Sequence, residues 1–233
     1  MLRLYQLAYV GPFYAGFAGF DRTLNEFLGK TDGALDPRSA RHQGALLNWL
    51  RAWGCRQFAK AHERTAARSL REWGDAHLDK LPPLGASLLN LRARDLDLAD
   101  EAYRDLEASR AGERSDRNGN LHGVTFGPTG ASKVLFALRP KALLAWDDAI
   151  RRRFGRSYRS LLDGTVEELR ELVEDAKRLG IGAGEIPRRV GRPNSLLAKL
   201  ADEYNWVTIT RKIEPPTPER LAEWARWASR HCC

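Results

Sequence analysis

Residues 126–159 read FGPTGASKVLFALRPKALLAWDDAIRRRFGRSYR and combine more structural and chemical signals than any other stretch of the chain. The turn Gly127-Pro128-Thr129-Gly130 leads into an apolar run that predicts a short helix over residues 129–138. Pro140 interrupts that helix. A further helix is expected to start near Asp147, because aspartate is a favoured N-cap residue. This stretch therefore predicts two helices joined by a short apolar connection.

Similar helical spacing of apolar residues recurs on both sides of this stretch. Residues 165–179 give the clearest pattern, with Thr165 and Glu168 forming an expected capping box. Polar, turn-rich residues 111–123 predict a loop, and residues 206–210 predict a short strand. Other helices are expected over residues 42–53, 58–73, 95–106 and 195–204 and from Pro218 onward. The sequence thus predicts an all-α fold, a single compact helical unit over residues 1–233, with a division into two subdomains left open.

The composition suits a globular protein with an anionic partner. The chain has 233 residues, 43% of them hydrophobic, and a formal net charge of +8. Such an excess favours DNA, RNA or an acidic membrane surface, and the alternative is a solvated basic surface without a specific partner. No run of 18 apolar residues and no C-x2-C pair occurs, so no membrane segment, metal site or cofactor is expected. The three cysteines fit a reducing compartment, which predicts a cytoplasmic protein.

Much of the surplus charge is concentrated in one region. Residues 133–159 contain eight Lys or Arg against two Asp, a net charge of +6. A cluster of this kind suits a phosphate backbone, and a solvated basic helix face is the alternative interpretation. The basic loop 188–194 is a second candidate for a phosphate contact. The cluster consists of Lys133, Arg139, Lys141, Arg151, Arg152, Arg153, Arg156 and Arg159.

Two features of the stretch are candidates for chemistry. Backbone N–H groups at the Gly127 turn could hold a phosphate at the start of the following helix, although an ordinary glycine turn would look the same. Asp147 is placed at a helix start, where a carboxylate could stabilise a positive transition state or activate water. Capping the helix alone is the alternative role for Asp147.

These features together resemble the helix-hairpin-helix DNA glycosylase superfamily over some 25 residues. Gly127 falls on the second glycine of the family's hairpin, Thr129 on its lysine and Ala131 on its alanine. Asp147, 18 residues beyond Thr129, falls on the catalytic aspartate, and Ile150 on the aliphatic position after it. The resemblance implies a helix-hairpin-helix element with its catalytic aspartate at residues 123–160, and double-stranded DNA as the partner. The implied DNA contacts are Gly127, Thr129, Gly130, Arg151, Arg152, Arg153, Arg156 and Arg159.

The sequence departs from the family pattern in ways that affect the expected chemistry. Thr129 replaces the lysine that forms a Schiff base in bifunctional members, which implies a monofunctional glycosylase. Lys133 lies one helical turn beyond Thr129, so a displaced lysine nucleophile stays open. Asp148 is an accessory residue or, if the register is off by one, the catalytic residue. Trp146 could line a pocket for an extruded base, with core packing as its alternative role.

The resulting hypothesis is a monomeric, monofunctional DNA glycosylase that flips out a damaged or modified base and leaves an abasic site. A non-catalytic helix-hairpin-helix DNA-binding protein and an RNA-binding factor are the rival hypotheses. The sequence names neither the base nor the setting, so DNA repair and an attack on modified phage DNA both stay open.

Overall fold

The structure is a computed structural model that describes residues 2–17, 19–116 and 118–231. It is mainly helical, as the sequence predicts, and the described residues contain a single two-stranded antiparallel sheet. No helix in the described part of the chain is long and apolar enough to cross a membrane. The α-helices are α1 (Leu4–Ala15), α2 (Gly19–Lys30), α3 (Ala40–Ala52), α4 (Glu63–His77), α5 (Ala93–Ala108), α6 (Gly127–Leu138), α7 (Asp148–Arg153), α8 (Tyr158–Arg178), α9 (Ile186–Arg189), α10 (Leu197–Asn205) and α11 (Pro218–His231).

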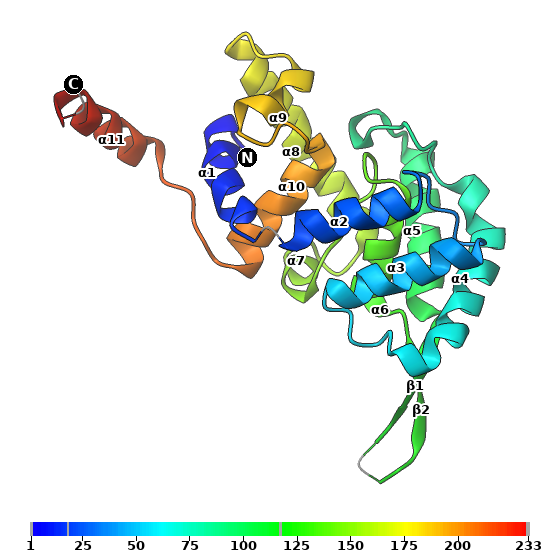
Figure 1. Cartoon of the computed structure of the whole chain (residues 1–233). Coiled ribbons are helices and arrows are strands. Elements are labelled where there is room, and N and C mark those ends of the chain that lie inside the picture. Colours follow the sequence, from blue (N-terminus) through cyan, green and yellow to red (C-terminus); the bar gives the residue numbers. More distant parts are fainter. Residues whose placement is uncertain (1, 18, 117, 232–233) are drawn as a thin grey trace.

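The helices form two neighbouring groups (Figure 1). Helices α2 to α6 pack against one another largely in chain order, whereas α1 packs against α8 and α10 from the other end of the chain. Helix α6 lies deep in the protein because Val134, Leu135 and Phe136 are almost completely buried. The chain passes between the two groups at the α1–α2 junction and again between α6 and α7, so residues distant in sequence meet there.

The segment between α5 and α6 corrects the sequence-based expectation. Instead of a loop over residues 111–123, the chain forms a β-hairpin of β1 (Arg110–Ser115) and β2 (Leu121–Thr125). Asp116 organises the turn, because its carboxylate accepts hydrogen bonds from the backbone N–H groups of Asn118 and Asn120. The hairpin projects from the body (Figure 1). The expected helix-hairpin-helix element is therefore not confirmed.

Two further expectations fail for local reasons. Helix α8 begins at Tyr158 with Ser157 as its cap, so Thr165 is buried in mid-helix and the expected capping box is wrong. Residues 206–210 form a π-helical turn that continues α10 rather than a strand. Trp206 packs edge-on against Tyr14 and Phe20, and this packing overrides the strand preference of the segment.

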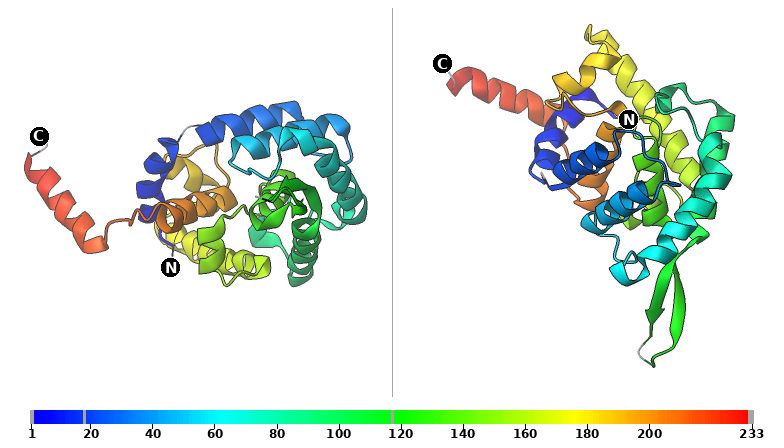
Figure 2. Two further views of the ribbon diagram at one scale, coloured as in Figure 1. Left: turned by 90° about the horizontal axis from the view of Figure 1, so that it is seen from below. Right: turned by 45° about the vertical axis from the view of Figure 1, so that its right-hand side comes forward.

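Helix α11 stands away from the rest of the chain in all views (Figures 1 and 2). It starts at Pro218, as expected from the Thr217-Pro218 pair. Trp224 and Trp227 on this helix are about half exposed, at 46% and 55%. Helix α11 therefore lies outside the compact body.

Candidate functional site

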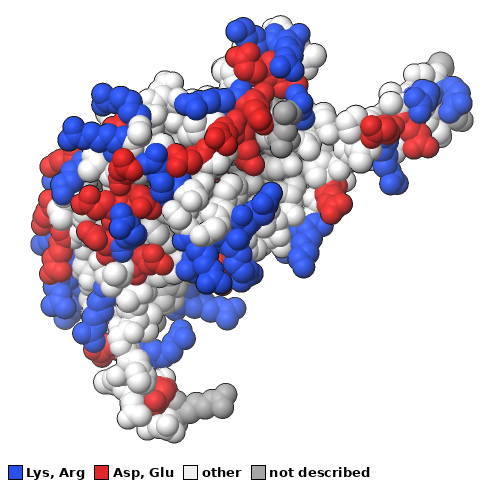
Figure 3. Space-filling model, turned by 180° about the vertical axis from the view of Figure 1, so that it is seen from behind, with Lys and Arg blue, Asp and Glu red and all other residues white. Residues whose placement is uncertain are grey.

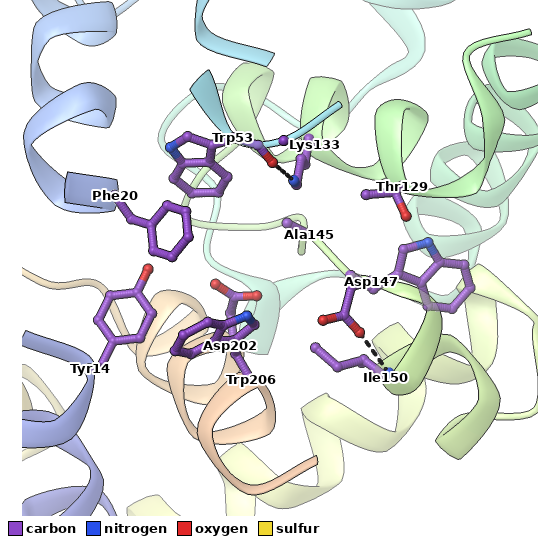
Figure 4. A pocket seen from close by; sticks show the side chains of 12 residues that line it. Tyr14, Phe20, Trp53, Thr129, Lys133, Ala145, Asp147, Ile150, Asp202 and Trp206 are labelled. Carbon is purple, nitrogen blue, oxygen red and sulfur yellow. Dashed lines mark hydrogen bonds between the residues drawn. The ribbon is translucent and has the colours of Figure 1, made fainter. Parts of the chain in front are cut away.

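A cavity of about 290 Å³ opens where the two helix groups meet (Figure 4). Four of the site residues predicted from the sequence, Thr129, Lys133, Trp146 and Asp147, line it together. The volume is near the lower end of the range for small-molecule pockets. The other lining residues are Tyr14, Phe20, Trp53, Gly54, Ala145, Ile150, Asp202 and Trp206.

Asp147 is fixed at the start of α7. Its Oδ1 atom accepts hydrogen bonds from the backbone N–H groups of Ala149 and Ile150, at 2.9 and 3.0 Å. Its Oδ2 atom accepts a hydrogen bond of 2.6 Å from the hydroxyl of Thr210. The N-cap role is thus confirmed, and the half-buried carboxylate also lines the cavity. The two roles are compatible, because capping holds the negative charge in one orientation.

Asp148 lies outside this cavity. Its side chain is 72% exposed, and its nearest charged partners are Arg151 and Arg152 at 3.7 and 3.8 Å. Consecutive side chains on a helix point about 100° apart, so only one of the two aspartates can face inward. Asp147 occupies the inward position.

Lys133 reaches the cavity from α6, one turn after Thr129. Its ammonium donates a hydrogen bond of 2.6 Å to the carbonyl oxygen of Trp53, as Figure 4 shows. It also lies 5.5 Å from the centre of the Trp53 ring. The thiol of Cys55 is close by, and burial raises the pKa of that thiol despite the neighbouring ammonium. The cavity thus contains a basic and an acidic group from the same predicted segment.

Trp146 is packed in the core and also lines the cavity. The ring is 2% exposed and packs edge-on against Tyr103 and Tyr158, which is core packing. Its indole N–H donates to the carbonyl oxygen of Pro128 at 3.2 Å. This hydrogen bond links the residue before Asp147 to the first turn of α6.

An aromatic wall completes the cavity and was not predicted from the sequence. Phe20 is the centre of this wall, with ring centroids 5.6 Å from Trp53 and 5.7 Å from Trp206. Tyr14 lies 5.7 Å from Trp206, and burial raises the pKa of its hydroxyl to about 12. The only hint in the sequence was the concentration of aromatic residues near the N-terminus.

A network of buried charges lies behind Tyr14. Lys199 donates to Asp202 at 2.7 Å and to the Tyr14 hydroxyl at 2.8 Å. Burial alone would lower the pKa of Lys199, but the surrounding acidic groups outweigh it and raise that pKa. Glu203, next along α10, pairs with Arg192 at 2.7 Å. The sequence predicts a phosphate contact in the loop 188–194. Arg192 of this loop does not fit that role, because its guanidinium points inward and pairs with Glu203.

The basic residues after Asp147 divide into two kinds. Arg152, Arg153 and Arg156 are exposed, whereas Arg151 is partly buried. Arg159 donates to Asp97 and pairs with Asp163 at 2.8 Å, so its charge is neutralised within the protein. Figure 3 shows Lys and Arg spread over one face of the protein with Asp and Glu mixed among them. Within the predicted cluster, Arg152, Arg153 and Arg156 thus stay at the surface, while Arg159 is paired within the protein.

The two glycines of the turn serve different purposes. Gly127 opens α6 with a φ of +64°, a conformation that favours glycine, and a Cβ there would meet open space. Gly130 is buried, and a Cβ there would lie 2.8 Å from Gln57 and 3.0 Å from Phe58. The expected DNA contact at Gly130 is thus corrected to a packing role, while Gly127 stays accessible.

One group of side chains has ligand atoms close enough for a metal ion within the described part of the chain. His77, Glu101 and Asp105 offer atoms within 4.8 Å of one another, but both carboxylates are exposed. These residues belong to α4 and α5 and do not line the cavity.

Comparison of the chain with protein-family models, curated proteins and solved structures finds no match.

Proposed function

We propose that this protein is a monofunctional DNA glycosylase of the helix-hairpin-helix type. The observation that carries the proposal is the convergence of Thr129, Lys133, Trp146 and Asp147 on one aromatic cavity. A short segment alone predicts Thr129 as a DNA contact, Trp146 as a residue of the base pocket, and Lys133 and Asp147 as candidates for the reaction. Aromatic walls suit a flipped nucleobase, which offers a π-face for stacking.

In the proposed mechanism, a base enters the cavity and its bond to the sugar C1′ atom breaks. The bonding electrons leave with the base, and positive charge develops on the sugar. Asp147 stabilises this charge, since its carboxylate is held in place before the reaction by three hydrogen bonds. Water then adds to C1′ and loses one proton, while the departed base gains one, so that the products are the free base and an abasic site. Lys133 supplies a hydrogen bond and positive charge to the departing base.

The chemistry proposed for this site uses water rather than a lysine adduct. Thr129 occupies the position of the family's Schiff-base lysine, and the ammonium of Lys133 is held by the carbonyl oxygen of Trp53. The proposed reaction needs no organic cofactor. We also propose that the partner is duplex DNA and that the protein is a cytoplasmic monomer.

Duplex DNA would approach through the exposed arginines beside Asp147. Replacing Arg152, Arg153 and Arg156 together with alanine is expected to reduce the slope of log K against log salt by roughly one to three units. The slope is measured by fluorescence anisotropy with a labelled duplex. Arg159→Ala is the matched control, because that guanidinium is only 26% exposed and pairs with both Asp97 and Asp163, whereas Arg152 has one more distant carboxylate, Asp148 at 3.8 Å. An unchanged slope in the triple variant would remove this surface from the DNA interface.

A non-catalytic DNA-binding protein is the second candidate function. It is favoured by the three hydrogen bonds that Asp147 accepts, which give this aspartate a structural role without any reaction. Alkaline cleavage of damaged and modified duplexes separates the two functions, since only a glycosylase leaves abasic sites. Preferential binding to structured RNA would contradict both.

A further inference from the structure

Asp202 is a second carboxylate that faces the cavity and that the proposed mechanism does not use. Its side chain is only 10% exposed. Its Oδ2 atom accepts a hydrogen bond of 2.7 Å from Lys199, while Oδ1 accepts none from any of the described residues. Figure 4 shows the carboxylates of Asp147 and Asp202 reaching the cavity from different elements. Because Oδ1 is not fully buried and Asp202 lines the cavity, a ligand there can supply the missing donor.

Lys199 holds the carboxylate of Asp202 in place. The side chain of Lys199 is 6% exposed and its ammonium also donates to the Tyr14 hydroxyl at 2.8 Å. Glu203 lies 3.9 Å from the same ammonium and is itself held by Arg192. Lys199 therefore cannot turn toward a ligand without leaving the carboxylate of Asp202 unpaired. Asp202 presents a fixed hydrogen-bond acceptor to the cavity.

The surroundings of this acceptor suit a flat ligand. Trp206 lies one helical turn after Asp202, and Phe20 packs edge-on against its indole ring at 5.7 Å. Aromatic side chains of this kind stack on any base without distinguishing one from another. Discrimination between bases must therefore come from polar groups at the cavity wall.

We propose that Oδ1 of Asp202 accepts a hydrogen bond from the amino group of an extruded base. This inference rests on the proposed function and names its substrate class, bases that carry an exocyclic amine such as derivatives of cytosine or adenine. An oxo base of the same shape would place a carbonyl oxygen against the carboxylate, so that two acceptors would face each other without a proton between them. Asp202 is thus a specificity-determining residue, distinct in role from Asp147.

The test compares free bases that carry an amino group with bases that carry an oxo group at the same ring position. Binding of cytosine against uracil, and of adenine against hypoxanthine, is measured by NMR titration of the full chain. We expect the amino member of each pair to bind about 10- to 100-fold more tightly, the range for one hydrogen bond to a charged group. Asp202→Asn should remove most of this preference, since an amide can also donate to a carbonyl oxygen. Asp75→Asn, an exposed aspartate on α4, is the matched control and should keep it.

The outcomes separate this inference from the proposed function. Equal affinities within each pair, no binding of any base, or an unchanged preference in Asp202→Asn would overturn the role of Asp202. The comparison in the wild-type chain decides the matter even if the variant does not fold. Formation of abasic sites in duplex DNA tests the glycosylase itself and does not depend on the result with free bases.

Discussion

Replacing Asp147 with asparagine is expected to slow base release about 100-fold or more while DNA binding stays intact. The substitution removes the negative charge that the positively charged sugar requires. Asparagine is also a good N-cap, so the hydrogen bonds to Ala149 and Ile150 can persist. The amide can donate to Thr210, whose hydroxyl can reverse its role. Release is measured as alkali-labile sites under single-turnover conditions, and binding by anisotropy with the same duplex.

Asp148→Asn is the matched control for this substitution, because it makes the same chemical change on an exposed side chain. It should retain most activity. A reversed result, with Asp148→Asn inactive and Asp147→Asn active, would assign the catalytic role to Asp148. If neither substitution changes the rate of release, the carboxylates of Asp147 and Asp148 are not needed for the reaction.

The second large effect concerns stability. Arg192→Ala is expected to lower the free energy of unfolding by roughly 3–5 kcal/mol, because it leaves buried Glu203 without its bidentate partner. It also removes the pair with Asp21 at 2.6 Å, which joins α2 to the chain before α10. Urea denaturation followed by circular dichroism gives the difference.

Arg188→Ala is the control for that measurement, since Arg188 pairs with Glu185 on the surface and its side chain is 70% exposed. A surface pair contributes roughly 0–1 kcal/mol. If Arg192→Ala costs no more than Arg188→Ala, the network behind the cavity does not stabilise the fold.

The helices that the sequence predicts correctly are marked by residues that lie next to one another in the chain. Helix α7 follows from an aspartate N-cap, and α11 from a Thr-Pro start. The hairpin over residues 110–125 has no alternating apolar pattern, because its strands are mostly exposed and its turn depends on the side chain of Asp116. Helix α1 was not predicted, since Gly11 and Pro12 obscure a helix that is set by packing against α8 and α10.

The same distinction holds for the candidate site, where only the residues that lie on one short segment were predicted. Lys133 and Asp147 were found because one short segment carries both, on adjacent helices. Asp202 and Tyr14 come from opposite ends of the chain, and no motif links them before the fold brings α1 against α10. Arg192 looked like a solvent-exposed base because its acidic partners, Asp21 and Glu203, lie on other segments.

The most direct test of the glycosylase is mass spectrometry of the bases that the protein releases from a panel of genomic DNAs. The panel includes damaged DNA and phage genomes with modified cytosines. We expect the wild-type chain to release a base from at least one of them, with an equal number of abasic sites, and Asp147→Asn to release almost none. Binding to duplex DNA without release of any base from the panel would contradict the proposed reaction.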